Sequence, residues 1–362
     1  MSKTVQVDTK TFVRFWLVVA VLAIAAFLIS QASTGILIVG IAIFFAIAVR
    51  PLVYKVEKLI GKDRHALASG LTVGGLVLVI GLALAVVGPT VVTETTNFLR
   101  DAPTMIQNDN GSWEKINDFG KFFGIEDAHA QIVSGIKDLS GQLLNGFKAN
   151  FLSSVGAVGS FLAGLILTII IAILWLIQGP EIMDKFWHKV TRKNSEVGKL
   201  SRRIVSNMSN VISKYVGGQA LVALLDGTVT GLIVFVLSLI FGFSSGLAFP
   251  MALIAAIFYL IPMFGPLITA VVVSLITFIS APLAGLIFLV AYVIYEQIEN
   301  NIIAPKVQGN ALDLPSVVIL ISVTIGIYMF GLIGAIISIP IAGMIKILID
   351  EYPNIRALRE RE

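Results

Sequence analysis

The stretch at residues 246–280, GLAFPMALIAAIFYLIPMFGPLITAVVVSLITFIS, decides how the second half of the chain folds. It is apolar throughout, yet Pro262 and Pro266 lie at its middle with Gly265 between them. Each proline removes a backbone donor and disfavours helix in the residue before it. The stretch therefore predicts two apolar half-helices separated by a break, each about as long as the shortest helix that crosses a bilayer core.

A second apolar stretch, 316–347, is interrupted in a comparable way. Phe330-Gly331-Leu332-Ile333-Gly334 lies at its middle, and Pro340 lies in its second half. Another apolar helix precedes each broken stretch, at 216–241 and at 283–299. We interpret this pattern as two copies of a helix followed by a broken hairpin. Re-entrant hairpins would give the copies opposite topology, as is typical of secondary transporters. The alternative is that both stretches are single kinked spans.

The composition indicates an integral membrane protein. Of its 362 residues, 57% are hydrophobic and 13% are charged, whereas soluble domains average about 25% charged residues. A chain this apolar would not stay soluble as one or two globular domains. The further apolar runs that predict spanning helices are 13–31, 35–49, 66–92 and 155–178. The predicted fold is an all-α integral membrane protein with about six full transmembrane helices and two broken re-entrant hairpins in inverted repeat.

Lysine and arginine in the connecting segments predict the orientation. Residues 50–65 and 179–214 are rich in both and are expected to be cytoplasmic, whereas 93–154 has more acids than bases and is expected to be external. Both termini then lie in the cytoplasm. The expected segments are N-terminal membrane helices over 1–92, an external helical segment over 93–154, membrane helix four over 155–178, a basic amphipathic cytoplasmic segment over 179–215, a transport core over 216–347 and a cytoplasmic tail over 348–362.

Several classes of function are disfavoured. The chain has no cysteine, so it has no thiolate metal site and no cysteine nucleophile. It contains no Gly-x-Ser-x-Gly, no His-Glu-x-x-His and no phosphate-binding loop. We therefore expect neither an enzyme nor an ATP-driven pump, and we expect no cofactor and no bound metal. The net charge of +4 reflects basic loops, so nucleic acid is not an expected partner.

Polar residues within the apolar helices are the candidates for ion or proton coupling. Asp226 lies near the middle of helix 216–241, where a carboxylate is costly and functional by default. Its alternative role is that of a protonated or hydrogen-bonded packing residue. Glu296, Glu299 and Asn300 share one helix face, which Tyr292 extends by one turn. They could bind a polar solute or hold a proton, or they could simply be solvated at a helix end.

The breaks at 262–266 and 330–334 are candidates for the solute site. Irregular backbone at membrane depth has to face protein or a wet cavity. The alternative is that each break is a structural kink held by neighbouring helices.

Three motifs resemble those of the autoinducer-2 exporter family of bacterial membrane proteins, and the likeness covers most of the chain. The motifs are Ile261-Pro262-x-Phe264-Gly265-Pro266, then Glu299-Asn300-x-x-Ile303-x-Pro305-Lys306-Val307-x-Gly309, then Gly326, Phe330-Gly331, Gly334, Pro340 and Lys346. Met263 departs from the aromatic residue common at its position, and Asp226 is not a position carried over from the family.

The resemblance implies a homopentamer in the bacterial inner membrane, in which each protomer has its own route and uses an elevator-like movement. It also implies export of a small polar metabolite such as autoinducer-2. We expect coupling to H⁺ or Na⁺ through Asp226, Glu296 or Glu299. The residues expected to bind or gate the solute are Pro262, Phe264, Gly265, Pro266, Asn300, Pro305, Gly309, Phe330, Gly331, Gly334 and Pro340. The alternatives are a sodium or lithium/proton antiporter and a non-transporting membrane scaffold.

Overall fold

The computed structural model describes residues 9–61, 64–108, 128–190, 196–308 and 314–359, and every regular element in these ranges is a helix. The α-helices are α1 (Thr9–Gln31), α2 (Ser33–Ile60), α3 (His65–Asn108), α5 (Ala128–Val190), α6 (Glu196–Phe241), α7 (Ala248–Tyr259), α8 (Phe264–Ser280), α9 (Pro282–Ile298), α10 (Ala304–Gln308) and α11 (Ser316–Arg359). A 3-10 turn, η1 (Ser245–Leu247), leads into α7, and a π-helix, η2 (Glu299–Ile303), joins α9 to α10.

Within the described ranges, six helical stretches are long and apolar enough to cross a membrane. Four of them contain the predicted spans 35–49, 66–92, 216–241 and 283–299, and a fifth, Leu162–Lys189, covers most of the predicted span 155–178. These stretches confirm an all-α membrane protein. The sixth is Ser316–Leu358, which contains the second broken stretch. The predicted first span, 13–31, lies within α1.

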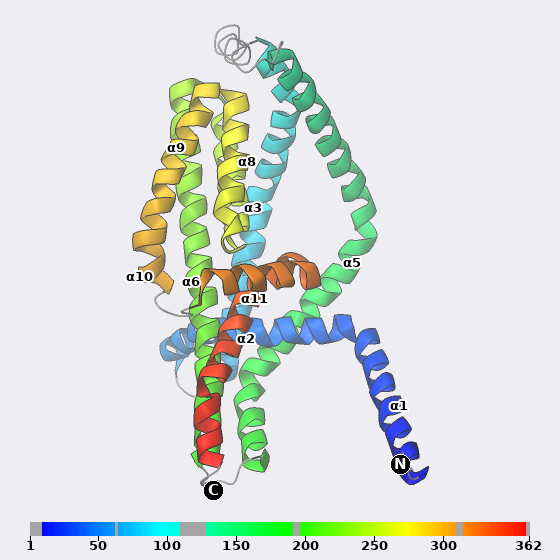
Figure 1. Ribbon diagram of the computed structural model, residues 1–362. Coiled ribbons are helices and arrows are strands. Elements are labelled where there is room, and N and C mark those ends of the chain that lie inside the picture. The colour runs from blue at the N-terminus through cyan, green and yellow to red at the C-terminus, as the bar shows by residue number, and fades with distance from the viewer. Residues whose placement is uncertain (1–8, 62–63, 109–127, 191–195, 309–313, 360–362) are drawn as a thin grey trace, which may run out of the picture.

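The helices run through the predicted segment boundaries. α3 continues from the third span as far as Asn108, and α5 joins the fourth span to residues on both sides of it. α6 likewise unites most of the predicted basic segment with the fifth span. Figure 1 shows α3, α5 and α6 as long helices that run along the length of the molecule, while α1 projects away from the rest. Residues 109–127, within the predicted external segment, lie outside the described ranges.

The first broken stretch separates into two helices at the place that the prolines predict. α7 ends at Tyr259, α8 begins at Phe264, and the two lie side by side as a hairpin (Figure 1). Met263, between them, has a φ of 67°, which is uncommon for a residue with a side chain. Gly265 is required because a β-carbon there would collide with the carbonyl oxygen of Phe258.

The second broken stretch also folds back on itself. Helical geometry in α11 is lost at Phe330 and at Gly331, whose φ is 60°. Gly326 and Gly334 then meet backbone to backbone, because a β-carbon on either would collide with the carbonyl oxygen of the other. Such an approach is impossible between residues eight apart in a continuous helix. Whether either hairpin enters the bilayer from one side only stays a prediction.

Small residues bring α7 close to α6. A β-carbon added at Gly227 would lie 2.6 Å from the carbonyl oxygen of Ala252, and one at Gly231 would lie 2.8 Å from the β-carbon of the same alanine. Glycine and alanine at such spacing allow helices in membranes to approach closely. The main apolar core lies around this contact and joins α6 to α9, whereas a second core joins α2, α3 and α5.

We predict that Gly227→Ala destabilises the protein, because the added methyl group has no room against α7. Overpacking of this kind costs roughly 1–3 kcal/mol. The thermal unfolding midpoint in detergent should therefore fall. Gly217→Ala, in the same helix, is the matched control, since nothing lies within 4 Å of a β-carbon there. Equal midpoints for the two variants would contradict the packing described.

Candidate functional site

Three carboxylates from two parts of the chain meet inside the second-half core. Asp226 comes from the middle of α6, Glu296 from the last turn of α9 and Glu299 from the start of η2. One oxygen of each lies within 4.8 Å of the others. The exposed fractions are 0% for Asp226, 9% for Glu296 and 0% for Glu299. We call these three residues the carboxylate cluster.

The backbone of α9 changes form beside this cluster. After Ile298 the α-helix gives way to the π-helix η2, which extends to Ile303. Short π-helical segments are rare in proteins, and many of those that occur lie at functional sites. Glu296 and Glu299 are one turn apart, so both can face α6.

Two hydrogen bonds satisfy only part of the carboxylate cluster. The Tyr292 hydroxyl donates to Asp226 Oδ1 at 2.9 Å, and Asn300 Nδ2 donates to Glu296 Oε2 at 3.2 Å. The second oxygens of Asp226 and Glu296, and both oxygens of Glu299, are buried without a hydrogen-bond partner in the described ranges.

No cationic side chain in the described part of the chain pairs with the carboxylate cluster. The ion pairs formed between described residues involve other carboxylates, such as Glu57 with His65 and Glu181 with Lys185. Burying a charge without a partner is very costly. The three groups therefore have to hold protons or share a cation that comes from outside.

Hydroxyl groups add neutral ligands around the same place. Thr230, Thr269 and Tyr295 each have a buried hydroxyl oxygen without a partner among the described residues. Tyr295 lies near enough to Asp226 and Glu296 to interact with both electrostatically. Oxygen-rich surroundings of this kind can receive a hard cation, a water molecule or the hydroxyl group of a solute.

The sequence predicted most of these residues as candidates but did not predict that they lie next to one another. It placed Asp226 on one helix and Glu296, Glu299 and Asn300 on another, without predicting that the two groups touch. Solvation of the two glutamates at a helix end is contradicted, because both side chains are buried. Asn300 is exposed but bonded to Glu296.

Thr269 was missed altogether. An isolated polar residue one turn after the first break is a signal that could have found it.

Other parts of the protein pack against the first break and hydrogen-bond to it. Gln219 Nε2 of α6 donates to the Tyr259 carbonyl oxygen at 2.7 Å, in buried surroundings. This bond satisfies a carbonyl that the end of α7 would otherwise leave free. Ile261 and Phe264 pack into a small apolar cluster with side chains of α6 and of the second hairpin: Tyr215, Val323, Ala335 and Ile339. Gly265 is buried, and Pro262 and Pro266 are half-buried.

The second break lies apart from the first. Phe330 is 49% exposed, and Gly331 is exposed with open space around it. The buried residues of this hairpin that pack in one cluster with the tip of the first are Val323, Ala335 and Ile339. Gly334 and Pro340 are buried within the hairpin, Pro305 is exposed in α10, and Gly309 lies outside the described ranges. The structure thus does not join the two breaks into one wet site.

We predict that Gln219→Leu lowers stability, because it leaves the Tyr259 carbonyl oxygen buried and unpaired. Such a loss costs about 1–3 kcal/mol, which thermal unfolding in detergent can measure. Gln297→Leu on the exposed face of α9 is the control and should leave the midpoint nearly unchanged. If both substitutions have the same small effect, the Gln219 bond does not hold the break.

Comparison with known proteins gives one consistent answer. A family model described as AI-2E family transporter matches residues 15–354. YueF of Bacillus subtilis (strain 168) is 25% identical over 337 residues, which are 92% of this chain and 87% of YueF. YrrI of the same strain is 27% identical over 191 residues, 52% of this chain and 51% of YrrI. Both are named only as candidate transport proteins.

A third relative has a more specific name. The AI-2 transport protein TqsA of Escherichia coli (strain K12) is 22% identical over 191 residues, 52% of each chain. The matches thus span about half the length of YrrI and of TqsA but most of YueF. Because the family model covers nearly the whole chain, this multi-pass membrane protein belongs to the AI-2E family of transporters.

Proposed function

We propose that the chain is a secondary transporter in which the carboxylate cluster couples movement of a small polar solute to a gradient of protons or Na⁺. The observation that carries this proposal is the burial of Asp226, Glu296 and Glu299 together, with no cationic side chain paired to them in the described ranges. Ionisable residues within membranes commonly mark ion pathways and proton relays.

Charge repulsion makes the stability of the carboxylate cluster depend on whether protons or a cation are bound there. Two unit charges 4 Å apart repel by about 4 kcal/mol at an effective dielectric constant of about 20. Three carboxylates that share one buried space therefore cannot all be ionised unless a cation joins them. Loss of a proton or cation would push α6 and α9 apart at this point, which links occupancy of the cluster to the relative position of two helices.

The solute is proposed to be a small hydroxylated metabolite, moved outwards. The unpaired hydroxyls of Thr230, Thr269 and Tyr295 support this class, because they can exchange hydrogen bonds with a polyhydroxy solute. The name of TqsA, an AI-2 transport protein, supports autoinducer-2 as the first compound to test. The end of α7 at Tyr259 meets α6 at Gln219, two helical turns from Asp226, and the adjoining tip of the first hairpin, at Phe264 and Gly265, is proposed as the gate.

The cellular setting is part of the same proposal. We propose an inner-membrane homopentamer with both termini in the cytoplasm. Lysine and arginine at 50–65 and 179–214 support this orientation. In Figure 1 the N- and C-terminal ends lie toward the same end of the molecule, which agrees with both being on one side of the membrane.

A second candidate function is exchange of Na⁺ or Li⁺ for protons without a metabolite. The donor set favours it as well, since carboxylate and hydroxyl oxygens are the ligands that hard cations prefer. In this version, cation and proton would compete for the carboxylate cluster from opposite sides of the membrane.

We predict that Asp226→Asn and Glu299→Gln each reduce gradient-driven flux in proteoliposomes by about tenfold or more, as expected for coupling free energies of a few kcal/mol. Internal pH and autoinducer-2 uptake are followed under an imposed proton gradient and then under a Na⁺ gradient. Glu181→Gln is the control, because its side chain is 68% exposed and lies outside the cluster. It should keep wild-type flux.

The outcomes separate the two functions. Metabolite flux that depends on a gradient and is lost in the cluster variants supports the coupled exporter. Proton movement driven by Na⁺ alone, with no metabolite flux, favours the antiporter. Wild-type flux in folded Asp226→Asn and Glu299→Gln proteins would remove the carboxylate cluster from both mechanisms.

A further inference from the structure

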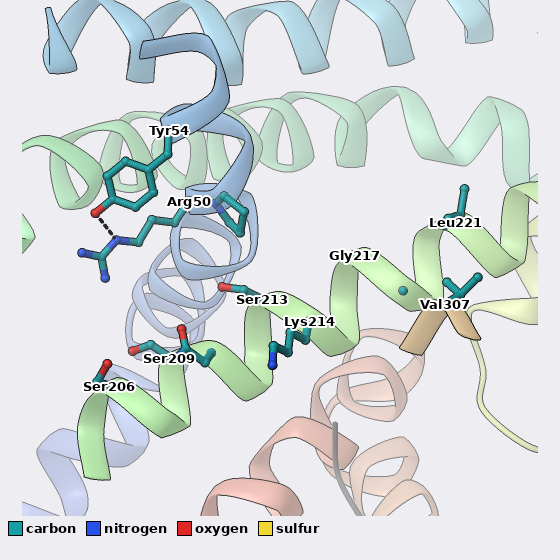
Figure 2. A pocket seen from close by; sticks show the side chains of 12 residues that line it. Arg50, Tyr54, Ser206, Ser209, Ser213, Lys214, Gly217, Leu221 and Val307 are labelled. Carbon is teal, nitrogen blue, oxygen red and sulfur yellow. Dashed lines mark hydrogen bonds between the residues drawn. The ribbon is translucent and has the colours of Figure 1, made fainter. Parts of the chain in front are cut away.

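A cavity of about 700 Å³ lies between α2 and α6, and no residue of the carboxylate cluster lines it (Figure 2). One end is lined by Arg50 and Tyr54 of α2 together with Ser206 and Asn210 of α6, and Lys214 follows one turn further along α6. The other end is apolar, at Leu221 and at Val307 of α10. We call this the α2–α6 pocket.

The charge of the α2–α6 pocket is entirely positive. Its lining contains the side chains of Arg50 and Lys214 and no carboxylate. Neither cation forms an ion pair with an acidic residue in the described part of the chain. Two cations from different helices that line one space, without a carboxylate there, favour an anionic ligand in it.

Tyr54 holds the arginine in place. Arg50 Nε donates to the Tyr54 hydroxyl at 3.1 Å, and the guanidinium carbon lies 5.4 Å from the centre of the Tyr54 ring. The two terminal nitrogens of the guanidinium thus stay available as a planar fork, the geometry that pairs with phosphate oxygens. Lys214 supplies a point charge, and Ser206 and Asn210 supply neutral donors.

Size and shape restrict the ligand further. A pocket of about 700 Å³ falls in the range used by small organic ligands and is far larger than inorganic phosphate needs. The apolar end at Leu221 and Val307 suits the remainder of such a ligand. We propose that the α2–α6 pocket binds a phosphate ester, with its phosphate group between Arg50 and Lys214.

An occupant of the pocket would adjoin the first break. Gly218 lines the pocket, and the next residue, Gln219, donates the hydrogen bond to the Tyr259 carbonyl oxygen. Val307 packs with Tyr259 in the same small cluster. The ligand is therefore placed to stabilise one position of the first hairpin, a role separate from the proposed coupling at the carboxylate cluster. Lipid headgroups and soluble phosphate esters share this chemistry, and basic pockets between helices bind anionic headgroups.

The test measures ligand affinity by calorimetry on the purified full chain in neutral detergent. The probes are dihexanoyl phosphatidylglycerol, glycerol 3-phosphate and an uncharged glycerolipid. Wild type should bind at least one of the two phosphate esters and not the uncharged lipid. The double variant Arg50→Gln/Lys214→Gln should bind at least about tenfold more weakly, because the phosphate group loses its charge-assisted hydrogen bonds to both cations.

Lys58→Gln is the matched control, because it removes one exposed cation from α2 outside the pocket and should preserve the affinity. If the double variant does not fold, Lys214→Gln alone carries the test and should weaken binding by about tenfold. Binding of phosphatidylglycerol alone identifies a lipid headgroup, and comparable binding of glycerol 3-phosphate identifies a soluble ester. Failure of both esters to bind, or equal affinity in wild type and the pocket variant, overturns the proposal.

Discussion

A backbone amide or carbonyl group that is buried away from water has to find a partner within the protein, and the arrangement of α6, α7 and α8 follows from this constraint. Pro262 and Pro266 make a continuous helix impossible, so the chain turns back and leaves the end of α7 to be satisfied from outside. Gln219 does so from α6. It can reach because Gly227 lets α7 approach α6 closely. One helix thus both carries the hairpin and closes its break.

The carboxylate cluster is the exception to the rule that buried polar groups are paired. The Tyr259 carbonyl oxygen at the first break is satisfied by Gln219, whereas Asp226, Glu296 and Glu299 together keep four oxygens without a partner in the described ranges. Buried polar groups without a partner destabilise the folded protein, and those found inside membranes commonly serve a function. The placement of the cluster between α6 and α9, beside the hairpin that α6 holds, makes it the natural point at which ion occupancy acts on helix position.

The sequence predicted the helical membrane fold and both breaks, because prolines and paired glycines act locally and long apolar runs have few alternatives. It found Asp226, Glu296 and Glu299 one helix at a time, since a buried carboxylate stands out against apolar neighbours. Their meeting was not predictable, because it depends on how α6 and α9 pack. The sequence also grouped the two breaks, whereas Phe330 and Gly331 lie exposed and away from the first. The α2–α6 pocket was not predicted for the same reason. Arg50 and Lys214 lie in separate basic segments of the sequence, and only the packing of α2 on α6 brings them to one pocket.

The most direct test of the account is to observe the protonation of the cluster itself. Infrared spectroscopy of the purified protein at neutral pH, in a buffer free of Na⁺ and Li⁺, reports the carbonyl stretch of protonated carboxylic acids. The account predicts such a band in wild type, a weaker band when Glu299 is replaced by Gln, and an unchanged band in Glu181→Gln. The absence of any protonated carboxyl band from wild type in that buffer would mean that the cluster is fully ionised without a cation, and it would contradict the central claim.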